Sequence, residues 1–107
     1  EDHEAIRRAT ERAARAAYLG VASGAARVQA LRQAVIAGES ALEAKTEGFE
    51  AGINTSIDVL DASRDLYRTK RDYAQARYTY LLNLLKLKQA AGTLAETDLA
   101  QVNGWLR

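Results

Sequence analysis

Two carboxylates that stand three residues apart, Asp58 and Asp61, are the strongest candidates for chemistry in this sequence. On a helix, residues with this spacing lie on one face, so their charges act together. Such a pair could belong to a functional site. It could equally satisfy the free backbone N–H groups and the dipole at a helix N-terminus, where acidic side chains are favoured. The spacing alone leaves both roles open.

The sequence contains no arrangement of residues that is typical of a catalytic site. The only histidine, His3, lies at the start of the chain, and there is no cysteine. A Ser-His-Asp triad or a histidine metal site therefore lacks its parts. The glycines match neither a dinucleotide-binding motif nor a phosphate-binding loop. We predict that the protein is not an enzyme and that it binds no cofactor or metal.

The composition argues against nucleic acid or membrane as partners of this segment. The 107 residues carry 15 basic and 14 acidic side chains, a net charge of +1, so no strong field is expected. Glu4, Glu11 and Glu39 interleave with the basic residues, which favours a solvated helix surface over a basic binding face. The most apolar stretch, residues 81–87, contains Asn83 and Lys86 and is shorter than the ~20 residues of a membrane span. The basic residues concerned are Arg7, Arg8, Arg12, Arg15, Arg27 and Arg32.

The elements that position Asp58 and Asp61 are predicted to be long helices. The chain has no proline, and strong helix formers dominate residues 2–48. An apolar residue recurs every seven positions, and a second row follows it three residues later. This is the pattern of a coiled-coil seam in which alternate positions of the second row are glycine, so that a partner helix can approach closely. The first row is Val21, Val28, Val35, Leu42 and Phe49, and the second is Gly24, Leu31, Gly38 and Lys45.

A turn is predicted over residues 49–55. Gly52 can adopt the left-handed conformation that commonly follows a helix. Thr55 and Asp58 then show the pattern of a capping box for a second helix over residues 56–91. Gly92 is expected to end this helix, and the residues from Thr93 to Glu96 to start a short third helix over residues 94–104.

The predicted fold is all-α: a single segment, residues 1–107, that forms a long antiparallel, coiled-coil-like helical hairpin plus a short C-terminal helix. The second helix carries two adjacent apolar rows, a stripe wider than a coiled-coil seam needs. One partner helix would cover only one of these rows, so we expect the segment to be part of a larger helical assembly. The two rows are Val59, Leu66, Tyr73, Tyr80 and Leu87, and Leu60, Tyr67, Ala74 and Leu81.

From Gly48 to Leu94 the sequence resembles the C-terminal helical segment of TolC-like outer-membrane efflux proteins, and residues 18–35 fit more loosely. The resemblance implies a homotrimeric duct, anchored in the Gram-negative outer membrane, that serves tripartite drug efflux or type I secretion. This chain would be a periplasmic fragment of its α-helical barrel. The motifs are Gly48-Phe49-x-x-Gly52, Asp58-Val59-Leu60-Asp61, Leu66-Tyr67, Ala76-Arg77-Tyr78-x-Tyr80-Leu81 and Ala91-Gly92-Thr93-Leu94.

The resemblance also implies roles for residues at the turn. Asp58 and Asp61 match carboxylates that ring the periplasmic entrance, where three-fold repetition would make an anionic collar that binds cations. Ala51, Gly52 and Ile53 occupy the tip at which a periplasmic adaptor, or membrane fusion protein, docks. An inner-membrane pump is the further partner that the family implies.

Two residues of the entrance gate depart from the family pattern. Phe49 stands where a tyrosine often supplies a gating hydroxyl, and Asn54 stands where a basic residue often makes a gating ion pair. Neither replacement can make the same contact, so the entrance is expected to be held closed differently. A separate hypothesis, a freestanding helical hairpin that acts as an interaction or scaffold module, also fits the glycine-spaced seam and the absence of catalytic groups.

Overall fold

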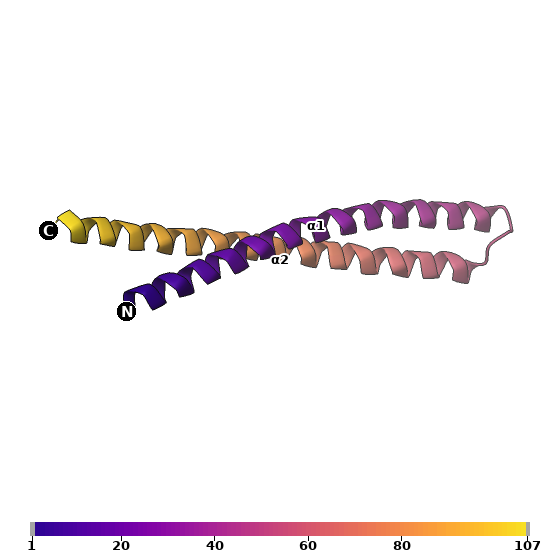
Figure 1. Cartoon of the computed structure of the whole chain (residues 1–107). Helices are drawn as coiled ribbons and strands as arrows, with labels where there is room; N and C mark the ends of the chain where they lie inside the picture. The colour runs from indigo at the N-terminus through magenta and orange to yellow at the C-terminus, as the bar shows by residue number, and fades with distance from the viewer. Residues whose placement is uncertain (1, 107) are drawn as a thin grey trace. The chain divides into compact units, whose positions relative to one another are not determined.

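Two long helices account for nearly the whole chain. In the computed structural model, α1 spans Asp2–Glu50, α2 spans Ser56–Leu106, and residues 51–55 form the turn that joins them (Figure 1). The structure describes residues 2–106, and for residues 93–95, 97–99, 101, 102, 105 and 106 it describes the backbone only. The predicted all-α helical hairpin is confirmed. No helix in the described part of the chain is both long and apolar enough to span a membrane.

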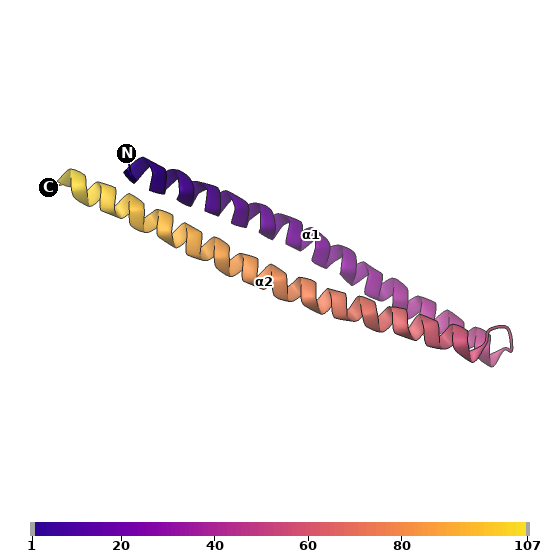
Figure 2. The same ribbon diagram turned by 90° about the horizontal axis from the view of Figure 1, so that it is seen from below.

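The chain divides into two compact units, each built from one part of α1 and one part of α2. The unit Ala25–Tyr78 contains the turn and the helical parts on either side of it. Figures 1 and 2 show α1 entering the turn and α2 leaving it in opposite directions, as in an antiparallel pair. The other unit combines Glu1–Gly24 with Thr79–Arg107.

In the unit Ala25–Tyr78, a glycine of α1 faces a buried leucine of α2. Leu66 of α2 is only 5% exposed, and a Cβ added to Gly38 of α1 would lie 3.1 Å from its Cδ1 atom. A methyl group at that distance would already crowd the leucine, so the absence of a side chain permits the approach. Ala76, also 5% exposed, is the second buried residue. The predicted seam is confirmed as far as Leu42, with Val28, Leu31, Val35 and Leu42 half-buried. Lys45 and Phe49, the last residues of the predicted rows, are exposed.

In the unit of Glu1–Gly24 with Thr79–Arg107, small residues of α1 again face larger residues of α2. A Cβ added to Gly24 would lie 3.4 Å from Cδ1 of Tyr80, and one added to Gly20 would lie 3.4 Å from Cγ of Asn83. These are close to ordinary contact distances, so the fit is less tight than at Gly38. The upstream seam residues Ala14, Ala17 and Val21 are half-buried.

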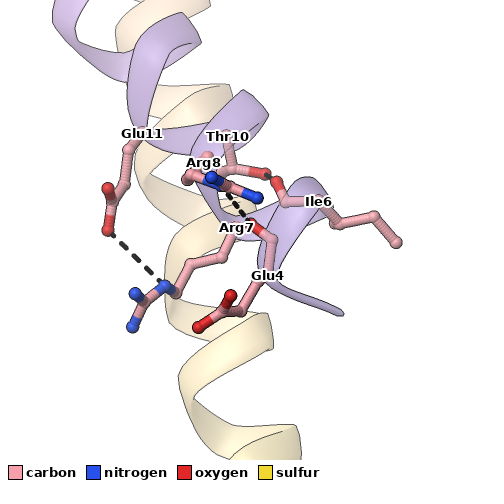
Figure 3. A network of polar contacts seen from close by, with 6 residues as sticks. All are labelled: Glu4, Ile6, Arg7, Arg8, Thr10 and Glu11. Atoms are coloured by element: carbon pink, nitrogen blue, oxygen red, sulfur yellow. Dashed lines mark hydrogen bonds and ion pairs between the residues drawn. The ribbon is translucent and has the colours of Figure 1, made fainter. Parts of the chain in front are cut away.

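The first turns of α1 carry polar contacts within the helix itself (Figure 3). The guanidinium of Arg7 lies 3.9 Å from the carboxylate of Glu11, and Nε of Arg8 donates to the carbonyl of Glu4 at 3.4 Å. The Thr10 hydroxyl donates to the carbonyl of Ile6 at 2.8 Å. These i to i+4 contacts are those of an exposed helix surface, and the Arg7–Glu11 pair is worth a few tenths of a kcal/mol (~0.2–0.5) at most.

A Schellman motif ends α1. The N–H of Gly52 donates to the carbonyl of Phe49 at 3.1 Å, and the N–H of Ile53 donates to the carbonyl of Gly48 at 2.7 Å. This pairing satisfies the last carbonyls of the helix and requires a left-handed residue, which Gly52 supplies with φ of 76°. The predicted role of Gly52 is therefore confirmed.

A reciprocal capping box begins α2, as the sequence predicts. The N–H of Thr55 donates to Oδ2 of Asp58 at 2.9 Å, and the N–H of Asp58 donates to Oγ1 of Thr55 at 3.2 Å. Hydrogen bonds from the backbone and then the side chain of Thr55 hold the pKa of Asp58 below its ordinary value. Desolvation opposes this lowering in part, and the charge of Lys45 makes the smallest contribution, which also lowers the pKa.

Two predicted boundaries differ from the structure. α1 continues to Glu50, two residues beyond the predicted end, and the predicted break at Gly92 is wrong because α2 runs without interruption to Leu106. Gly52 is the only described glycine with positive φ, so Gly92 stays in the helical region. A helical glycine costs about 1 kcal/mol relative to alanine, which the flanking helix formers can offset. Thr93 is the predicted cap of the third helix, and the structure describes only its backbone.

Gly52→Ala and Gly92→Ala are expected to change stability in opposite directions. The first forces an alanine into a left-handed conformation and should lower the free energy of unfolding by about 1–2 kcal/mol. The second removes a glycine from a helix interior with no atom within 4 Å of the added Cβ, and should raise it by up to about 1 kcal/mol. Urea unfolding followed by circular dichroism measures both. A loss of stability on Gly92→Ala would contradict the continuous α2.

Acid should weaken the start of α2 through protonation of Asp58. Because the folded-state pKa of Asp58 is lowered, its contribution is complete above the unfolded value of about 3.9 and is lost as the pH falls through the folded value. The stability difference between the wild type and Asp58→Asn should therefore be largest near neutral pH and shrink below about pH 4. Urea unfolding across this range tests the idea, and a difference that does not change with pH would refute it.

Candidate functional site

The candidate site lies where α1 ends and α2 begins. Apolar side chains remain exposed there: Ile53 is 81% exposed, Ile57 66%, and Phe49 and Leu60 49% each. A Schellman motif often brings the residue at the position of Ile53 against the residue at that of Gly48. Gly48 has no side chain to offer, so Ile53 projects into solvent instead. Ala51 and Gly52 beside it are exposed as well.

Asp58 and Asp61 line one shallow groove between α1 and α2. The groove has a volume of 360 Å³. Its lining includes three aspartates of α2, Asp58, Asp61 and Asp65, and one lysine of α1, Lys45. The structure thus places the two predicted entrance carboxylates together. The remaining lining residues are Gly38, Ala41, Ala62, Leu66 and Thr69.

The three carboxylates of the groove differ in their partners. Asp58 belongs to the capping box, and Asp65 lies 3.8 Å from the guanidinium of Arg68. Asp61 makes no ion pair among the described residues. In the same residues no three acidic or histidine side chains gather closely enough to hold a metal ion. The groove can therefore attract cations by its field, while its side chains do not form a coordination site.

Asn54 and Phe49, the two predicted gate residues that depart from the family pattern, lie outside the lining of this groove. Nδ2 of Asn54 donates to the backbone carbonyl of Lys45 at 3.3 Å, which adds a cap to the end of α1. Gly48 makes room for this fold-back, because an added Cβ would lie only 2.8 Å from Cγ of Asn54. Asn54 thus has a local structural contact, while Phe49 projects from the last turn of α1.

Sequence analysis did not single out Lys45 as a functional residue. It appeared only as a member of the second seam row, three residues after Leu42. A charged residue at a position where the seam otherwise carries glycine or leucine was the available signal. In the structure Lys45 is exposed and belongs to the acidic groove.

The second apolar row of α2 is exposed, as predicted. Tyr67 is 67% exposed, Leu81 56% and Leu60 49%, and the neighbouring Tyr78 and Leu85 are similar at 65% and 62%. The unit of Glu1–Gly24 with Thr79–Arg107 also has a hollow of 680 Å³, whose lining from α1 is Ile6, Thr10 and four alanines. Both features are apolar surfaces that this chain does not cover among its described residues.

The sequence is similar to outer-membrane proteins over its full length. A family model described as "Outer membrane efflux protein" matches residues 1–93. The chain is 42% identical to "Outer membrane protein TolC" of Vibrio cholerae over 107 residues. The matched region is 100% of this chain and 24% of that protein. It is 38% identical to "Outer membrane protein TolC" of Escherichia coli K12 over 106 residues, a region that is 99% of this chain and 22% of that protein.

A third relative is "Proteases secretion protein PrtF" of Dickeya chrysanthemi, 34% identical over 86 residues that cover 80% of this chain and 19% of that protein. The chain thus spans about a quarter or less of the length of these relatives. The family match and these relatives confirm the prediction that this chain is not an enzyme. The family match over most of the sequence, together with the whole-chain identity, shows that the chain belongs to the outer membrane efflux protein family.

Proposed function

We propose that this chain is a periplasmic segment of the duct of an outer-membrane efflux or secretion protein, and that it carries the duct entrance and the adaptor-docking tip. The observation that carries the proposal is the turn, where an acidic groove and an exposed apolar tip lie side by side in a member of this family. The parent is a homotrimer that connects, through a periplasmic adaptor, to an inner-membrane pump.

The exposed second row of α2 supports a place in a wall of helices. One face of α2 packs on α1, while Leu60, Tyr67 and Leu81 remain in solvent. Burying a large apolar side chain is worth about 1.5–3 kcal/mol, so this row strongly favours another helix on that side. A ring of helices, each with two neighbours, covers both rows. The family match favours this role over a freestanding interaction module.

The acidic groove supports the role of an entrance that attracts cations. Repeated around a three-fold axis, Asp58 and Asp61 bring several negative charges to one level of the duct. Charges that converge on a narrow opening concentrate cations, and this effect weakens with salt. Asp58 caps α2 and contributes its charge at the same time, because a capping carboxylate stays ionised.

The exposed tip supports docking of the adaptor. Ile53 and Ile57 offer apolar surface, and an added Cβ at Gly52 would meet no atom within 4 Å, so a partner can approach this backbone closely. The relative PrtF is a proteases secretion protein, which favours secreted proteases as cargo, while membership of the efflux protein family favours efflux. We therefore assign the chain to export in general, which includes both protein secretion and efflux.

Replacing both Asp58 and Asp61 by Asn in the full-length parent should weaken block of its single-channel current by a trivalent cation. Loss of both charges in each protomer should raise the blocking concentration by about tenfold or more at low salt. Asp72→Asn is the control, because it removes the same kind of charge from α2 outside the groove. An unchanged block in the double variant would leave Asp58 with capping alone.

Ile53→Ser in the full-length parent should weaken adaptor binding by about tenfold or more, since burial of one isoleucine contributes about 1.5–3 kcal/mol. Surface plasmon resonance with the purified adaptor measures the dissociation constant. Ile36→Ser, at an α1 residue that is 50% exposed and away from the turn, should leave that constant unchanged. Equal effects of the two substitutions would remove the tip from the docking surface.

A further inference from the structure

Lys45 is a charged residue of the groove that the proposed function does not yet use. It reaches the groove from α1, while the carboxylates of Asp58, Asp61 and Asp65 reach it from α2. The related positions of the same seam row, Gly24, Leu31 and Gly38, are uncharged. A lysine at this place opposes the field that the aspartates create.

The neighbouring charges leave Asp58 and Asp61 as the carboxylates on which Lys45 acts. Asp65 has Arg68 at 3.8 Å, and Glu39 of α1 has Lys70 of α2 at 4.0 Å. Lys45 is in none of the described ion pairs within 4 Å, so no such pair ties it to one carboxylate of the groove. Hydrogen bonds from Thr55 are the main cause of the lowered pKa of Asp58, and the charge of Lys45 adds a smaller contribution in the same direction.

The turn fixes where Lys45 stands. Its backbone carbonyl accepts the hydrogen bond from Asn54, which ties this turn of α1 to the segment that leads into α2. The capping box then sets the position of Asp58 relative to Thr55. Hydrogen bonds at the turn thus hold Lys45 and Asp58 at one level of the hairpin, without an ion pair between the two side chains.

We propose that Lys45 is a specificity-determining residue of the entrance: its positive charge offsets part of the Asp58 and Asp61 charge and lowers the affinity of the entrance for cations. The inference rests on the proposed entrance function, and it names a residue that tunes the cation affinity of that entrance. In a trimer each protomer sets one ammonium against two carboxylates. The entrance is then less anionic than the aspartates alone would make it.

The experiment is lanthanum(III) block of the full-length parent in planar bilayers at low salt, with a charge series at one position. Lys45→Met should lower the lanthanum concentration needed for block by about threefold to tenfold. The substitution removes from each protomer one positive charge that would repel the cation. Lys45→Glu should lower it further, and Lys45→Arg should leave it unchanged. Lys86→Met, the same charge change outside this groove, is the matched control.

A graded order of Lys45→Glu, Lys45→Met and wild type supports the proposal, since a purely structural role would not follow the charge. Suppose block is lost in the Asp58 and Asp61 double variant but is the same in Lys45→Met and wild type. The role of Lys45 is then refuted, and the proposed entrance stands. If lanthanum blocks none of the proteins, the entrance function itself fails, and the role of Lys45 fails with it.

Discussion

The close approach of α1 and α2 at Gly38 is the constraint on which the candidate site depends. Leu66 fills the space that a side chain of α1 would otherwise occupy, so the two backbones can lie near each other in the unit Ala25–Tyr78. With only Leu66 and Ala76 buried among the described side chains, this contact cannot be replaced by a thick core. The groove that contains Lys45 and the aspartates begins at the same pair of residues, because Gly38 and Leu66 form part of its lining.

The turn adds a second constraint, since it must end one helix and begin another within five residues. It does so with three sets of local hydrogen bonds: the Schellman motif, the fold-back of Asn54, and the capping box. Each set uses residues that would otherwise be free for binding. The outcome is a division of labour between two neighbouring carboxylates, in which Asp58 serves the helix and Asp61 remains free of ion pairs among the described residues.

Sequence reasoning succeeded where a local rule decides the structure. The glycine-spaced seam, the left-handed Gly52 and the Thr55–Asp58 box each follow from short-range sterics or hydrogen bonding. It failed at Gly92, where a weak breaker sits in strong helix-forming surroundings and propensity alone does not decide. It also missed the hydrogen bond from Asn54 to the carbonyl of Lys45 and the place of Lys45 in the groove, because no sequence pattern marks either one.

The seam also limits how hairpins of this kind can change length during evolution. Leu66 covers Gly38 in one unit and Tyr80 covers Gly24 in the other, and both the glycines and the residues that cover them lie two heptads apart. One inserted residue rotates everything that follows it in a helix by about 100°, which would turn the glycines away from their partners. An insertion of a whole heptad in each helix would instead keep each glycine facing the residue that covers it.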